Sequence, residues 1–208
     1  MIVSTMQKAL WLAVSCAVAT VLAADLPQQI HIAFAGVDSE GNPSGMAISW
    51  QTVKDTATTQ VKYGLSSSSL TSVASGSSST YYVTYDHHVA IENLKPNTKY
   101  YYQCGDASAG WSETLSFVTA PSRSTIEYPL KIAIVGYLGM WYSEDTRSSL
   151  QALADKGEFD WSWHLGDVGY ADDDWLHQPF KDGYEDAYNT YMNAIQGFVS
   201  TLPYMVIV

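Results

Sequence analysis

The sequence predicts two domains: an all-β antiparallel sandwich, followed by the first part of an α/β domain with a parallel sheet. Between residues 27 and 120, short runs in which apolar and polar residues alternate recur with turn residues between them. After residue 129 the pattern changes to continuous apolar runs separated by helix-like segments, which is typical of buried parallel strands. Of the 208 residues, 47% are hydrophobic and 15% are charged, so we expect packed cores rather than disorder.

The N-terminus has the layout of a secretory signal peptide. Lys8 precedes a mostly apolar run, and the small residues Ala23 and Ala24 close it before Asp25. The alternative, a membrane anchor, is disfavoured because the run is short for a spanning helix. We therefore expect residues 1–23 to be a signal peptide, and the mature protein to be secreted and extracellular with no membrane partner.

Charge and cysteine content exclude some classes of protein. The net charge of −11 provides no basic surface for a phosphate backbone, so we expect no nucleic-acid partner. An acidic surface does not forbid a small phosphate substrate, because a bound metal can reverse the local field. Cys16 lies in the expected signal peptide, which leaves Cys104 alone and predicts no internal disulfide.

The first domain is expected over residues 24–121. Its strands are predicted by alternating runs around residues 30–34, 46–50, 61–63, 83–91, 100–104 and 115–118. The serine-rich stretches 66–69 and 75–79 are expected to be solvated loops. His87 and His88 are neighbours on a strand and should point to opposite faces, which argues against a shared metal site.

Residues 94–100 carry a more specific signal. The segment Leu94-Lys95-Pro96-Asn97-Thr98-Lys99-Tyr100 resembles the turn and tyrosine corner of a fibronectin type III domain, in which a tyrosine hydroxyl bonds back to the backbone. Trp50 would then be the core tryptophan of this sandwich.

Residues 122–129 are expected to be a linker, and residues 130–208 the beginning of the second domain. Two apolar strands, around residues 132–135 and 159–165, flank a helix that Gly157 is expected to end. This is a βαβ unit with parallel strands. A second helix over residues 184–198 leads to a third expected strand at residues 205–208.

The residues that carry chemistry follow the first two of these strands. Residues 136–139 and 166–170 both leave carboxyl ends of parallel strands, where functional loops gather. The second loop places Asp167 and Tyr170 three residues apart, and a hard trivalent cation takes oxygen ligands of both kinds. The alternative is a turn in which Asp167 caps a helix and Tyr170 packs.

Several motifs together resemble the N-terminal part of a purple acid phosphatase. They are Pro27-Gln28-Gln29-Ile30-His31-Ile32, Tyr100-Tyr101-Tyr102-Gln103-Cys104-Gly105, and His164-Leu165-Gly166-Asp167 with Tyr170-Ala171-Asp172. In this family a fibronectin-like domain precedes a calcineurin-like metallophosphoesterase domain. The resemblance implies hydrolysis of phosphate monoesters at acid pH by iron(III) and a divalent metal, which is zinc, manganese or iron. It makes Asp167 the carboxylate that bridges the two metals and Tyr170 the phenolate on iron.

The sequence departs from the family pattern at two places. Tyr137 stands where the family has an iron-binding aspartate, and we do not expect its longer ring to replace a carboxylate. A sequence error or a decayed gene are alternative explanations, since one base separates Asp from Tyr. The family's Gly-Asn-His-Glu block, expected after residue 208, is not in the chain, and Asp167 and Tyr170 alone are not expected to bind two metals stably.

Two functions therefore remain open at this stage. One is acid phosphatase activity, inherited from the family. The other is a catalytically inactive secreted protein in which only the fibronectin-like module is intact and binds a partner. The sequence indicates neither the physiological substrate nor the oligomeric state.

Overall fold

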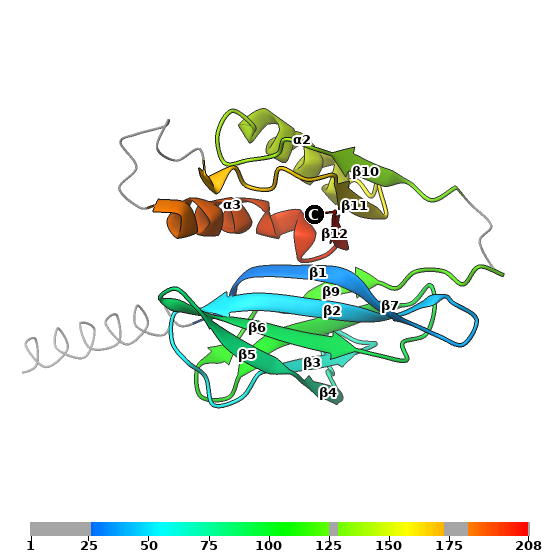
Figure 1. Ribbon diagram of the computed structural model, residues 1–208. Coiled ribbons are helices and arrows are strands. Elements are labelled where there is room, and N and C mark those ends of the chain that lie inside the picture. Colours follow the sequence, from blue (N-terminus) through cyan, green and yellow to red (C-terminus); the bar gives the residue numbers. More distant parts are fainter. Residues whose placement is uncertain (1–25, 125–128, 173–182, 208) are drawn as a thin grey trace, which may run out of the picture.

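The computed structural model describes residues 26–124, 129–172 and 183–207. The expected signal peptide and the middle of the expected linker lie outside these residues. An antiparallel β-sandwich forms one part of the molecule, and an α/β unit lies over one of its sheets (Figure 1). No helix in the described segments is both long and apolar enough to cross a membrane.

The sandwich consists of two antiparallel sheets. The first has the order β1-β2-β6-β5, and its strands are β1 (Gln28–Val37), β2 (Pro43–Thr52), β6 (Thr84–Ile91) and β5 (Ser77–Tyr81). The second has the order β4-β3-β7-β8, with β9 also paired to β7. Its strands are β3 (Gln60–Gly64), β4 (Ser72–Ser75), β7 (Lys99–Asp106), β8 (Gly110–Trp111) and β9 (Leu115–Val118).

Alternation along the strands produces the core of the sandwich, as expected. The inward residues include Ile32, Ile48, Trp50 and Tyr102, and all are buried. The hydroxyl of Tyr100 accepts a hydrogen bond from the Lys95 amide at 3.1 Å, so the predicted tyrosine corner is present.

The expectation that residues 75–79 form a loop was wrong. This serine-rich stretch supplies the end of β4 and most of β5, which pairs antiparallel with β6. It is an edge strand whose residues are almost all exposed. Its serine hydroxyl groups face water, while its backbone pairs with β6 and completes the sheet. The serine content therefore correctly predicted that this stretch is exposed, but it wrongly predicted a loop in place of a strand.

The lone described cysteine is buried in the sandwich. Cys104 is fully inaccessible, and burial raises the pKa of its thiol to about 12. The thiol therefore stays protonated and unreactive at physiological pH.

The α/β unit has the predicted βαβ arrangement. The parallel strands β10 (Ile132–Val135), β11 (Trp161–His164) and β12 (Tyr204–Val206) lie in that order. Helix α2 (Glu144–Asp155) joins the first two strands, and helix α3 (Gly183–Val199) precedes the third. Gly157 follows α2 with φ +67°, as expected of a residue that ends a helix. Both helices pack on one face of the sheet around Leu150, Tyr191 and Ile195.

Helix α3 also joins the two parts of the molecule, because it lies along β1 (Figure 1). A bulge between Gln28 and His31 interrupts the pairing of β1 with β2, and Gln29 has φ +56° there. The amide of Ile30 donates instead to the Gln196 side chain of α3 at 2.9 Å. Asn189 of α3 accepts hydrogen bonds from Gln29 and Gln51, each at 3.2 Å.

The two neighbouring histidines of β6 face opposite sides, as predicted. His87 is 1% exposed and its ring stacks on Trp50 with centroids 5.1 Å apart, whereas His88 is exposed. Thr52 Oγ1 donates to the Lys54 carbonyl, so it accepts from His87 Nε2 at 2.8 Å. Thr59 Oγ1 then donates to His87 Nδ1 at 2.9 Å. The neutral ring is fully paired in this arrangement.

We predict that the stability of the fold decreases as the pH falls below about 6.5. Burial lowers the pKa of His87 from its ordinary 6.5, so the unfolded chain takes up the proton first and is favoured as pH drops. Above about pH 6.5 the His87 ring is neutral in both the folded and the unfolded chain, so its full contribution to the free energy of unfolding is present. The free energy of unfolding, measured in urea at pH 7.5 and 5.5, should depend less on pH in His87→Gln than in the wild type. The exposed-site control His88→Gln should keep the wild-type dependence, and equal slopes in all three proteins would contradict the prediction.

Candidate metal centre

The loops that follow β10 and β11 lie side by side at one edge of the parallel sheet. The Leu165 amide donates to the Val135 carbonyl at 2.8 Å, which continues the strand pairing to the end of both strands. Beyond it, the Gly169 amide donates to the Leu138 carbonyl at 3.0 Å, and the Met140 amide donates to the Gly169 carbonyl at 3.2 Å. The two loops predicted from the sequence to carry chemistry are therefore held together by their own backbones.

Glycine makes this close approach possible. A Cβ atom on Gly139 would lie 2.9 Å from Cδ2 of Tyr170 and 3.2 Å from the Gly169 carbonyl oxygen. Contacts this short require the backbone or the ring to shift, so a side chain at position 139 would displace Tyr170.

Four residues other than glycine adopt left-handed backbone conformations in these loops. The φ angles are +54° at Tyr137, +55° at Tyr142, +58° at Asp167 and +50° at Tyr170. Such conformations are costly for bulky residues and cluster at functional sites. Aspartate tolerates this region better than tyrosine, so the backbone at position 137 suits a short polar side chain.

The side chains of the candidate ligands point out from this edge. Asp167 is exposed, and Tyr170 is half-buried with its ring stacked on that of Tyr137 at a centroid distance of 6.1 Å and an angle of 25°. Tyr137 is 79% exposed. The Tyr137 ring covers one face of the Tyr170 ring. The two adjacent loops thus present the carboxylate of Asp167 together with the phenols of Tyr137 and Tyr170.

The described residues do not supply a complete metal site. Among them, no group of three or more His, Cys, Asp or Glu side chains is close enough to hold an ion. Asp167 and Tyr170 offer one carboxylate and one phenol, which is too few donors for two metal ions. The donor types suit a hard trivalent cation, but the donor number does not suit a binuclear centre.

Beneath the loops, a chain of buried polar groups runs from helix α3 to β11. Tyr191 Oη lies 3.2 Å from Tyr204 Oη, which lies 2.5 Å from Nδ1 of His164. His164 is completely buried, and burial lowers its pKa although the nearby Asp167 and its backbone act in the opposite direction. Its Nε2 has no hydrogen-bond partner among the described residues. His164 thus belongs to the packing under the Asp167 loop.

Sequence reasoning missed the residue that anchors the other loop. Arg147, in the first turns of α2, donates to the carbonyls of Gly139 and Met140 at 2.7 and 3.0 Å, and to Ser143 Oγ at 2.7 Å. It therefore fixes the loop that carries Tyr137. The sequence did offer one hint of this role. Arg147 closely follows the loop that begins at Gly136, and the chain has only 10 Lys and Arg residues in all.

Two observations define the class of protein: a β-sandwich precedes a parallel α/β unit, and paired strand-end loops carry oxygen donors. Residues 27–119 match the family model described as Purple acid Phosphatase, N-terminal domain. Purple acid phosphatase 21 of Arabidopsis thaliana is 35% identical over 86% of this chain and 36% of its own length. Acid phosphatase type 7 of Danio rerio is 34% identical over 86% of this chain and 38% of its own length. The chain belongs to the purple acid phosphatase family.

A solved structure has the same fold over both parts of the chain. The purple acid phosphatase PPD1 from yellow lupin seeds superposes with a TM-score of 0.69 over 88% of this chain and 35% of its own, at 20% identity. One further relative, 33% identical over 70% of this chain, is named Fe(3+)-Zn(2+) purple acid phosphatase 12, from Arabidopsis thaliana. This chain spans little more than a third of the length of the relatives that it matches.

We predict that Tyr137→Asp raises the affinity of the chain for iron(III) by at least about tenfold, because it supplies a third oxygen donor on a backbone that suits aspartate. The measurement is titration with ferric nitrilotriacetate, followed by the visible phenolate-to-iron absorbance. Tyr170→Phe in the same background should abolish the colour.

Tyr142 provides a matched control for this change. It lies on the same loop, has φ +55° and is 96% exposed, so Tyr142→Asp makes the same chemical change at a position that has no candidate role as a ligand. Equal gains in iron affinity from Tyr137→Asp and Tyr142→Asp would show that position 137 has no special relation to the site.

Proposed function

We propose that the protein to which these residues belong hydrolyses phosphate monoesters at acid pH at a centre of iron(III) and a divalent metal. The observation that carries the proposal is the pair of loops at the carboxyl edge of the sheet, with Asp167 and Tyr170 on one of them. Asp167 would bridge the two metals and Tyr170 would bind iron. When bound, the metals supply the Lewis acidity that activates the attacking water.

The described chain by itself holds too few ligands for that centre. Its own residues position Asp167 and Tyr170 through the backbone pairing of the two loops, and Arg147 fixes the neighbouring loop. The remaining donors would come from a longer polypeptide, in keeping with the greater length of the relatives. We propose that residues 130–208 are the first portion of a metallophosphoesterase domain.

The N-terminal domain supports a second candidate function. Residues 27–119 match one family domain and have a hydrophobic core of their own, so this fibronectin type III-like module is proposed to bind a partner where the catalytic part is incomplete. Residues 1–23 are proposed to direct secretion, with residues 24–121 as the sandwich and 122–129 as the linker.

The test compares hydrolysis of 4-nitrophenyl phosphate at pH 5 by two proteins supplied with iron(III) and zinc(II). The first is the chain itself, for which we predict no turnover above the metals alone. The second is a chimera that joins the chain, carrying Tyr137→Asp, to the remaining length of Arabidopsis purple acid phosphatase 21. We predict turnover by the chimera and a loss of about 100-fold or more when Asp167→Ala is added.

The intact Arabidopsis protein serves as the positive control. Turnover by the chain alone that disappears with Asp167→Ala would show that the described residues suffice for catalysis. A folded chimera that binds both metals yet remains inactive would contradict the roles proposed for Asp167 and Tyr170.

A further inference from the structure

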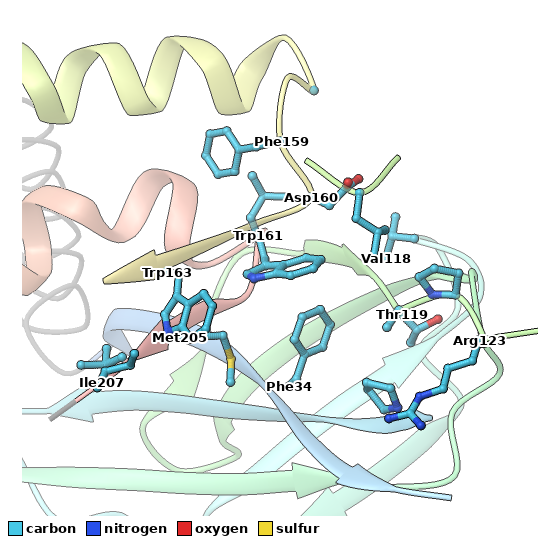
Figure 2. Close-up of a pocket in the computed structure, with 17 residues that line it drawn as sticks. Phe34, Val118, Thr119, Arg123, Phe159, Asp160, Trp161, Trp163, Met205 and Ile207 are labelled. Atoms are coloured by element: carbon cyan, nitrogen blue, oxygen red, sulfur yellow. The ribbon is translucent and has the colours of Figure 1, made fainter. Parts of the chain in front are cut away.

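Two cavities between the sandwich and the α/β unit differ in their chemistry. The larger, of about 740 Å³, is largely apolar, and Figure 2 shows Trp161 and Trp163 directed toward Phe34 of β1 across it. The smaller, of about 330 Å³, lies between the outer face of the sheet β1-β2-β6-β5 and helix α3, and most of the residues that line it are polar. Sites for small molecules typically have volumes of about 300–1,000 Å³. The smaller cavity therefore has the size and the lining of a site for a small polar ligand.

A chain of hydrogen bonds with a fixed direction crosses the floor of this polar cavity. A carboxylate only accepts hydrogen bonds, so the 3.2 Å contact between Gln51 Nε2 and Asp86 turns the amide nitrogen of Gln51 toward Asp86. Gln51 Oε1 then accepts from Gln29 Nε2 at 2.7 Å. Gln29 is only 6% exposed. The chain therefore ends at Gln29 Oε1, a buried acceptor to which no donor among the described residues is bonded.

His31 supplies a second acceptor to the polar cavity, which it lines. The backbone carbonyl of Gln29 can only accept, so their 2.8 Å contact places the proton of the neutral ring on His31 Nδ1. Burial lowers the pKa of His31, although the hydrogen bond to Gln29 and the charge of Asp86 act in the opposite direction. The ring is therefore neutral near pH 7, and its Nε2 atom carries a lone pair.

The polar cavity carries negative charge. Asp86 lines it, and neither Lys nor Arg is found among the described residues of its lining. A second carboxylate lies nearby on α3, because burial and the charges of Glu185 and Asp86 together raise the pKa of Tyr81. Tyr81 and Tyr188 also line the cavity, and the face of a phenol ring attracts a cation.

These features favour an ammonium ion over other small polar ligands. Asp86 would repel an anion, and a neutral sugar would take the carboxylate out of water without bringing a compensating charge. A primary ammonium ion brings one positive charge and three N–H donors. The cavity offers three acceptors to match them, which are the Asp86 carboxylate, Gln29 Oε1 and His31 Nε2.

We propose that the polar cavity binds a small primary aliphatic amine, whose ammonium group donates to Asp86, Gln29 Oε1 and His31 Nε2. The carbon chain of the amine packs against Tyr188 and Met192, which form the α3 side of the cavity. The proposal does not depend on the proposed catalytic activity, because none of these residues lies on the loops that follow β10 and β11.

The experiment titrates the full chain with butylamine at pH 7.5, where the amine is an ammonium ion, and follows binding by calorimetry and by the NMR signals of the His31 ring. Two comparison ligands share the four-carbon chain. We expect 1-butanol, which has no charge, and butyltrimethylammonium, which has no N–H donor, each to bind at least about tenfold more weakly.

Asp86→Asn should also weaken the binding of butylamine at least about tenfold, because asparagine keeps an acceptor for Gln51 but removes the charge. Glu92→Gln is the matched control. It removes one negative charge at an exposed position just beyond β6 that does not line the cavity, so it should bind butylamine like the wild type. The ligand series on the wild type tests the proposal independently of the stability of either variant.

Three results would overturn the proposal: no binding of butylamine to the wild type, equal binding of butylamine and 1-butanol, or equal weakening by Asp86→Asn and Glu92→Gln. Tighter binding of butyltrimethylammonium than of butylamine would show that the three acceptors are not used. A chain that binds glucose and not butylamine would assign the cavity to a neutral ligand, which would likewise contradict the proposal.

Discussion

The arrangement of the whole molecule depends on the docking of helix α3 onto strand β1. The bulge at Gln29 frees the Ile30 amide from the sheet, and Gln196 of α3 takes it as a hydrogen-bond partner. A buried backbone donor without a partner costs about 1–3 kcal/mol, so the Gln196 side chain stabilises the bulge by pairing the amide that the sheet leaves free. At the far end of α3, the buried hydroxyl of Tyr102 donates to the Ser200 carbonyl at 2.6 Å.

The same helix determines where the candidate site lies. Its apolar side supplies Tyr191, Ile195 and Phe198 to the core under the parallel sheet, and Tyr191 reaches Tyr204 and through it His164. The Asp167 loop leaves the sheet directly after His164. Helix α3 packs on the sandwich on one side and on the parallel sheet on the other, so it fixes the position of the two loops relative to the first domain.

The sequence predicted the features that depend on local periodicity. Alternation identified the sandwich strands, the 94–100 motif identified the tyrosine corner, and apolar runs identified the βαβ unit. It failed where neighbours decide the outcome. The serines of β5 form a strand because β6 offers its edge, and no residue pattern marks the bulge at Gln29. The pairing of the site loops followed from strand order, whereas the role of Arg147 required knowing where the Gly139 carbonyl points.

If the docking of α3 onto β1 holds the molecule together, the two elements should unfold together, and amide hydrogen exchange at Ile30 tests this most directly. In Gln196→Ala, the account predicts that the opening free energies of the Ile30 amide and of the α3 amides fall together by about 1–3 kcal/mol. In Asn193→Ala, which changes an exposed residue of the same helix, both should remain as in the wild type. Unchanged protection at Ile30 in Gln196→Ala, or α3 amides that exchange at their own lower free energy in the wild type, would contradict it.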